Sequence, residues 1–121
     1  MRTVLLFLVL GSLSFCVLCL CPHQTPGLRR WSHGSSWPGN KKPGTHARVV
    51  ITDAILLDES PPELSSVTIE TGGRLVWSPD GDYNLTTQYI LIKGRFDIGS
   101  DDCKFNRKAN ITLTGNETIV I

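Results

Sequence analysis

The feature that most constrains the fold is a repeated unit of two short apolar runs separated by a glycine turn. Three segments share this form: VTIETGGRLVW, ILIKGRFDI and ITLTGNETIVI. Val67, Ile90 and Ile111 begin these copies at spacings of about 20 residues, and Val49 begins a degenerate earlier copy. Strand-only units with this period predict an all-β fold of short stacked strands, a β-helix or β-roll in which each coil buries its inward residues on its neighbour.

Alternation of apolar and polar residues predicts strands throughout the region after residue 46. Apolar side chains fall two positions apart, and Gly, Pro or Asp bounds each run. An antiparallel β-sandwich is the alternative, because short strands with turns every 8 to 12 residues or so suit that architecture as well. The expected inward pairs are Val49 and Ile51, Ile55 and Leu57, Val67 and Ile69, Leu75 and Trp77, Ile90 and Ile92, Phe96 and Ile98, Ile111 and Leu113, and Ile119 and Ile121.

The first 20 residues have the pattern of a secretory signal peptide. A single basic residue, Arg2, precedes an apolar run from Val4 to Leu20. We expect cleavage after Cys19 or Leu20, so that the mature chain begins near Cys21. A membrane anchor is the alternative, but the run is short for a bilayer span of about 20 residues. The prediction is therefore a secreted, extracellular protein with no stable membrane span after cleavage.

The chain divides into three predicted regions: the signal peptide at 1–20, an arm at 21–46, and a β domain at 47–121. The arm is rich in Pro and Gly and has no helical or strand period. Its indoles, Trp31 and Trp37, are expected to dock it onto the β domain. The β domain stops in mid-strand pattern, at NETIVI. We expect it to be C-terminally incomplete, as a truncated product, a short paralogue or an incomplete gene model.

The sequence after the signal peptide contains two covalent features that are typical of secreted proteins, a cysteine pair and glycosylation sequons. The two cysteines that remain after cleavage, Cys21 and Cys103, are expected to form a disulfide in an oxidising compartment. Such a bridge would close a loop of about 80 residues and stabilise the fold by roughly 4 to 5 kcal/mol on the chain-entropy estimate. Three sequons, at Asn84, Asn110 and Asn116, are predicted N-glycosylation sites.

The charge balance gives no bulk attraction to nucleic acid. Without Arg2 the chain has 11 basic and 11 acidic residues, so its formal net charge is 0. The charges are nevertheless uneven, because a basic arm precedes an acidic stretch that contains Asp53, Asp58 and Glu59. A solvated surface is the ordinary meaning of such runs, and binding of a polyanion is the alternative.

Catalysis and metal binding are not expected. FDIGS differs from an aspartic-protease loop at Ile98, where Ser or Thr should orient the carboxylate, and no second lobe is present. DGDYN begins like an EF-hand loop, but Leu85 and Leu91 replace the required Gly and Glu. The spacing of Cys21 and the three histidines matches no common zinc pattern, and GxSxG is absent. We therefore predict no catalytic residue, no metal and no cofactor.

Four segments together resemble the G-8 (eight-glycine) domain of the family of cell-migration-inducing and hyaluronan-binding proteins, transmembrane protein 2 and fibrocystin-like proteins. They are CPHQTPGLRRWSHG, ILLDESPPELSSVTIETGGRLVW, YILIKGRFDIGSDDCKF and KANITLTG. The resemblance implies an extracellular setting connected with hyaluronan and its matrix. It also implies a long β-helical region after the domain, which this sequence lacks.

The function expected from the residues and this resemblance is a secreted, non-catalytic binding or structural module. The alternatives are a fragment of a hyaluronan-depolymerising enzyme whose active region is absent, and a truncated product without independent function. Expected partners are hyaluronan or another extracellular glycan, or an extracellular protein. The candidate ligand contacts are the cations and indoles of the arm, although burial of both indoles is the favoured alternative for them. These contacts are Arg29, Arg30, Trp31, Trp37, Lys41 and Lys42.

Overall fold

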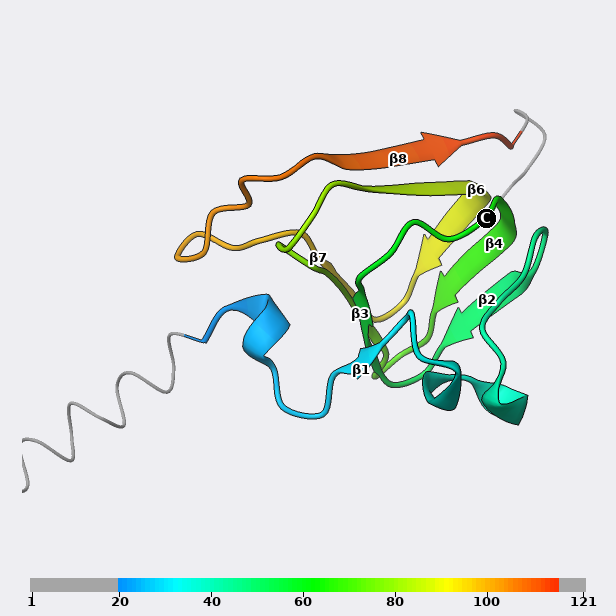
Figure 1. Cartoon of the computed structure of the whole chain (residues 1–121), viewed down its shortest axis with the longest axis horizontal. Coiled ribbons are helices and arrows are strands. Elements are labelled where there is room, and N and C mark those ends of the chain that lie inside the picture. The colour runs from blue at the N-terminus through cyan, green and yellow to red at the C-terminus, as the bar shows by residue number, and fades with distance from the viewer. Residues whose placement is uncertain (1–19, 116–121) are drawn as a thin grey trace, which may run out of the picture.

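The computed structural model describes residues 20–115, which form short strands and three 3-10 helices (Figure 1). The strands are β1 (Arg29–Arg30), β2 (Arg48–Ile51), β3 (Ala54–Leu57), β4 (Leu64–Ile69), β5 (Arg74–Trp77), β6 (Tyr83–Ile92), β7 (Arg95–Asp97) and β8 (Ala109–Leu113). The helices are η1 (Pro22–Gln24), η2 (Gly34–Ser36) and η3 (Pro38–Asn40). Apart from Leu20, the predicted signal peptide lies outside the described residues, as do Asn116 and the last expected inward pair, Ile119 and Ile121.

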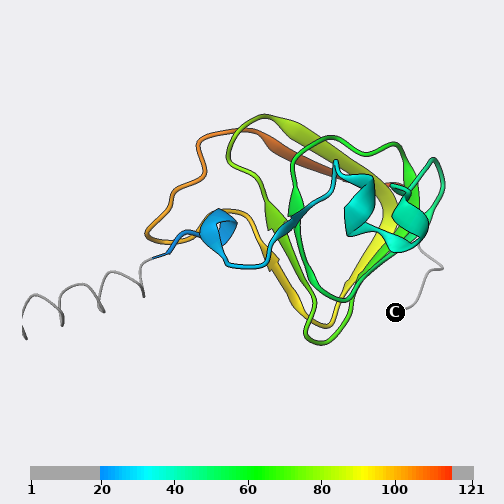
Figure 2. The same ribbon diagram turned by 60° about the horizontal axis from the view of Figure 1, so that its bottom comes forward.

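The strands form two four-stranded sheets, with the orders β1-β3-β5-β7 and β2-β4-β6-β8. Each pairing between neighbouring strands in residues 20–115 is parallel. Successive strands therefore alternate between the sheets while the chain winds in one direction, as Figure 2 shows from a second side. The fold is a stack of parallel coils, so the predicted β-helix is confirmed and the antiparallel sandwich is wrong.

Apolar residues of successive coils stack on one another inside the two sheets. Ile55 pairs with Leu75 and Leu75 with Phe96, while Val49 pairs with Val67 and Val67 with Ile90. The members of these columns in β2 to β5 are buried, whereas Ile90 of β6 and Phe96 of β7 are partly buried and pack against them. Burial of each such side chain stabilises the fold by about 1.5–3 kcal/mol, so each coil depends on its neighbours for its core.

Two stacked glycines allow the chain to turn tightly between the sheets. A Cβ atom at Gly73 would collide with the carbonyl oxygen of Ile51, and one at Gly94 would collide with the carbonyl oxygen of Gly73. Backbone of one coil thus occupies the space that a side chain of the next coil would need. This contact explains the glycine in each of the turns TGGR and KGR.

The long strand β6 bends between two pairing partners. Residues 83–87 pair with β8, whereas residues 87–92 pair with β4. Leu85 and Thr87 are buried, but the next inward position is Ile90, so the side-chain alternation shifts by one residue at the bend. Consequently Ile111 pairs with Leu85 and does not continue the column of Val67 and Ile90.

The arm, which its sequence predicts to be extended and without a strand period, adds a short strand to the stack. Its strand β1 pairs with β3, and the backbone N–H of Trp31 donates to the Leu56 carbonyl oxygen at 2.9 Å. The rings of Trp31 and Trp37 lie 4.8 Å apart in an edge-to-face arrangement. Trp37 Nε1 donates to the Trp31 carbonyl oxygen at 2.9 Å, which satisfies its buried indole N–H. Trp31 and Trp37 thus pack in the core and dock the arm onto the coils, as predicted.

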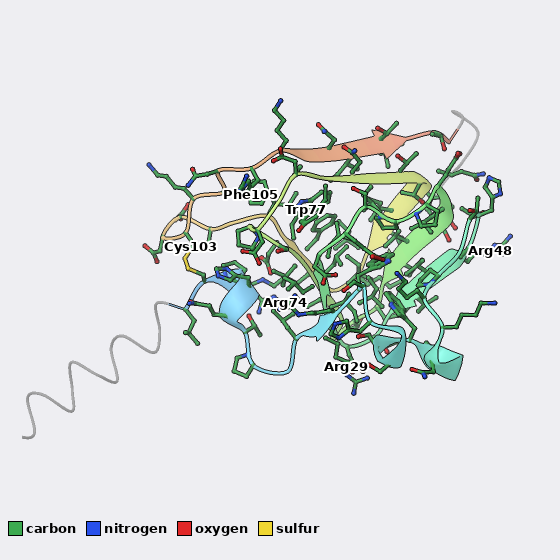
Figure 3. The ribbon with its side chains drawn as sticks, in the orientation of Figure 1. Arg29, Arg48, Arg74, Trp77, Cys103 and Phe105 are labelled. Atoms are coloured by element: carbon green, nitrogen blue, oxygen red, sulfur yellow. A yellow bond between two sulfur atoms is a disulfide. The ribbon has the colours of Figure 1, made fainter. Side chains whose placement is uncertain are left out.

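A disulfide between Cys21 and Cys103 joins the start of the arm to the loop that follows β7. Helix η1 packs beside β5 at this point. The sulfur–sulfur bond is drawn in Figure 3 next to Cys103. The predicted disulfide is therefore present in the structure, and it spans the stack from its first coil to its last described turn.

The last inward positions are exposed because no further coil covers them in residues 20–115. Ile111 pairs with Leu85 and Leu113 with Thr87, yet Ile111 and Leu113 are 40% and 59% exposed. Ile92 is exposed for the same reason, since β8 pairs only with the first half of β6. Ile98, which lies just beyond β7, is also exposed rather than inward-packed as its alternation indicates.

Candidate functional site

The six candidate ligand contacts separate into three groups in the structure. Trp31 and Trp37 belong to the core, with exposed fractions of 1% and 8%. Neither indole therefore offers a face on which a sugar ring could stack. Their contribution to a site is indirect, because they hold the arm in the position from which its cations reach solvent.

Two of the four cations are neutralised by neighbouring carboxylates. Arg30 Nη1 lies 3.6 Å from Asp58 Oδ2, and Lys42 Nζ lies 2.9 Å from Glu59 Oε1. Asp58 also accepts hydrogen bonds from the Ser32 N–H at 2.9 Å and the Ser32 hydroxyl at 2.6 Å. These acidic residues fasten the arm to the segment after β3, so Arg30 and Lys42 are less available to a ligand.

Arg29 and Lys41 remain without a carboxylate partner among the described residues. Arg48 of β2, which the sequence-based set omits, has none in that part of the chain either. All three side chains are exposed. Arg29 pairs in register with the buried Ile55, yet its side chain is exposed at the edge of the molecule, because no other described strand pairs with β1 on that side (Figure 3).

Two hollows lie between these cations. The first, of about 300 Å³, is lined by Arg29 together with polar residues that include Ser35, Ser36 and Asp53. The second, of about 310 Å³, is lined by Lys41 and Arg48. Both are also lined by Trp37, Pro38 and Val50, so they adjoin one another at the first coil. We call the surface of Arg29, Lys41, Arg48 and these hollows the basic end.

The composition of the basic end suits an extended anion better than a compact one. Three separate cations surround it, and Val50, which is 55% exposed, supplies an apolar surface between the hollows. Asp53 lines the first hollow, and the described residues that line the second include no carboxylate. Such a surface can attract spaced carboxylates electrostatically while apolar sugar faces contact the valine.

A third hollow, of about 230 Å³, lies beside the disulfide and is lined by Trp77, Phe105, His23, Asp102 and Lys104 among others. The Trp77 ring stacks on Phe96 at 6.2 Å, and its Nε1 is a buried donor without a partner in the described structure. The charges around this hollow have both signs. It therefore has no preference for an anion comparable to that of the basic end.

The FDIGS loop is occupied by structural contacts. Asp97 accepts hydrogen bonds from Arg74 Nε at 2.7 Å and from Arg95 Nε at 3.1 Å, one to each carboxylate oxygen.

Within residues 20–115, no three His, Cys, Asp or Glu side chains come together in a way that could hold a metal ion. The same residues contain no helix of the length and hydropathy needed to cross a membrane.

The parallel coils and the buried tryptophan arm define the class of this chain: a β-solenoid domain. A family model described as the G8 domain matches residues 36–121. The chain therefore belongs to the G8 domain family. The matched range begins inside the arm, at η2, and the division of the chain at residue 46 stays a prediction.

Relatives that share this domain are much longer than this chain. A cell surface hyaluronidase of Danio rerio is 38% identical over 112 residues, 83% of this chain and 7% of that protein. Fibrocystin-L of Homo sapiens is 40% identical over 90 residues, 71% of this chain and 2% of that protein. A protein of Dictyostelium discoideum is 41% identical over 101 residues, which cover 82% of this chain and 9% of that protein. No solved structure gives a significant match.

Proposed function

We propose that this chain is a secreted, non-catalytic G8 module that binds an acidic extracellular polysaccharide, hyaluronan in the first place, at its basic end. The observation that carries the proposal is the position of Arg29, Lys41 and Arg48 around two adjoining hollows, each without a carboxylate partner in the described residues. Hyaluronan offers one carboxylate per disaccharide, so a surface with separated cations complements it.

The relative named as a cell surface hyaluronidase supports a glycan ligand, since a hyaluronidase acts on hyaluronan. That name belongs to a protein of which this chain covers 7%, so we assign depolymerisation to regions outside the shared domain. Asp97 is held by two arginines, so this carboxylate is not free to act on a glycosidic bond.

The proposal is tested by measuring hyaluronan-oligosaccharide binding of the purified protein and of two triple variants. Arg29→Ala/Lys41→Ala/Arg48→Ala removes the cations of the basic end. Lys104→Ala/Arg107→Ala/Lys108→Ala removes the same charge from exposed positions before β8, at the other end of the stack. We expect the first variant to bind about tenfold more weakly, because it loses three charge contacts that are each worth a few tenths of a kcal/mol or more. The second variant should bind like the parent protein.

Two results would contradict the proposal. Equal losses of affinity in the two variants would show that binding depends on the net charge of the protein and not on the cations of the basic end. Shortened hyaluronan after incubation with the purified protein would show that the module is catalytic.

A further inference from the structure

Two of the three predicted glycosylation sequons lie side by side on neighbouring strands. The parallel register pairs Asn84 with Asn110, Leu85 with Ile111 and Thr86 with Thr112. The triplets NLT and NIT, 26 residues apart in sequence, are therefore superimposed residue for residue on β6 and β8. Both asparagines are exposed, so each could meet a transferase before the strands pair.

The two asparagine side chains also contact each other directly. Asn110 Nδ2 donates a hydrogen bond to Asn84 Oδ1 at 2.8 Å. In the described residues, Asn84 Nδ2 donates to no protein acceptor. The two amide nitrogens are thus inequivalent: that of Asn110 is used by the contact between the strands, and that of Asn84 remains free.

From this register we infer that the two sequons form one glycosylation site, occupied at Asn84, and that a folded molecule does not carry glycans at Asn84 and Asn110 together. The inference rests on the proposed function, because it needs export through a glycosylating compartment. Transfer from a lipid-linked diphosphate donor forms the bond between Nδ2 and sugar C1 and breaks the bond from C1 to the phosphate oxygen. One amide proton and the lipid diphosphate are released.

The spacing of the strands is what excludes double occupancy. Neighbouring strands lie about 4.8 Å apart, and in-register side chains leave the sheet in the same direction. Two branched glycans attached at that spacing would compete for the same volume and lose much of their conformational freedom. Pairing of β6 with β8 in a doubly modified chain would therefore be opposed by the sugars themselves.

The choice of Asn84 follows from both geometry and synthesis. A sugar on Asn84 Nδ2 leaves Asn84 Oδ1 available to accept from Asn110, so the contact between the strands survives. The chain is exported with its N-terminus first, so Asn84 reaches the transferase before Asn110 does. Once Asn84 is modified and β8 has paired, Asn110 lies against the sugar.

The test is intact-mass and peptide mapping of the full chain recovered from the medium of secreting animal cells. An Asn116→Gln background removes the third sequon, so that each remaining glycan belongs to Asn84 or Asn110. We expect one glycan per molecule, located at Asn84 by conversion to Asp on enzymatic deglycosylation in heavy-oxygen water. A secreted species with both sites occupied would overturn the inference, as would an unmodified Asn84.

Two further variants remove one sequon each without changing the paired asparagines. Thr112→Ala should leave the glycan mass unchanged, whereas Thr86→Ala should move the single glycan to Asn110. Loss of all glycan in secreted Thr86→Ala would contradict the idea of one shared site. Failure of the parent chain to reach the medium would instead contradict the extracellular location in the proposed function, and the inference with it.

Discussion

Arg74 joins Thr25 of the arm to Asp97 of β7. Its Nη1 donates to Thr25 Oγ1 at 2.9 Å, and its Nε donates to Asp97 Oδ2 at 2.7 Å. The disulfide from Cys21 to Cys103 crosses the same region. One side chain and one covalent bond thus fasten the arm across the coils, and the arm carries two of the three cations of the basic end.

The ion pair of Arg74 should contribute more to stability than that of Arg95, although both meet Asp97. The Arg74 side chain is 21% exposed and that of Arg95 is 67% exposed. We expect Arg74→Met to lower the free energy of unfolding by about 1–3 kcal/mol, because it removes a charged bond from a largely enclosed carboxylate. Arg95→Met should cost under about 1 kcal/mol, as is usual for an exposed pair. Urea unfolding measures both, and equal losses would contradict the difference in burial.

The disulfide should be a major source of stability. We expect Cys21→Ser/Cys103→Ser to lower the free energy of unfolding by about 2–5 kcal/mol, because the unfolded chain is no longer cross-linked. Secreted yield should fall with it. Lys104→Ser, which changes the exposed neighbour of Cys103, should stay within about 0.5 kcal/mol of the parent. An unchanged melting temperature in the double variant would show that the bridge does not fasten the arm.

The stacked glycines give a sharp test of the coil packing. Gly94→Ala should be strongly destabilising, because its Cβ would strike the carbonyl oxygen of Gly73 and backbone cannot move aside cheaply. Gly44 has open space around its added Cβ and lies in the loop before β2. Gly44→Ala should therefore be neutral or slightly stabilising, by up to about 1 kcal/mol. Similar melting temperatures for the two variants would contradict the stacking of turns.

The repeat of short apolar runs predicted the parallel coils because stacked coils place like residues in register, as for Val67 and Ile90. The repeat places Ile111 in register with Ile90, and this alignment is wrong. Ile111 pairs with Leu85 because β6 bends, so that its first half pairs with β8 and its second half with β4. Alternation of apolar and polar residues does not show where a strand bends. The pattern does not predict β1, because a strand of two residues is too short to show a period.

The site could be predicted only as a set of charges. Sequence placed Arg29 beside Arg30 and Lys41 beside Lys42, but it could not show that Arg30 and Lys42 meet carboxylates. That difference depends on the path of the arm, which Trp31 and Trp37 determine through the core. The candidate contacts do not include Arg48, although its alternation with Val49 marks it as an outward residue of β2.

The most direct test of binding at the basic end is a nuclear magnetic resonance titration of the labelled protein with hyaluronan oligosaccharides. Binding at the basic end should produce the largest changes in amide chemical shift at Arg29, Lys41, Arg48 and Val50, and salt should reduce these changes. Changes confined to the hollow of Trp77 and Phe105, or no change at saturating oligosaccharide, would contradict binding at the basic end.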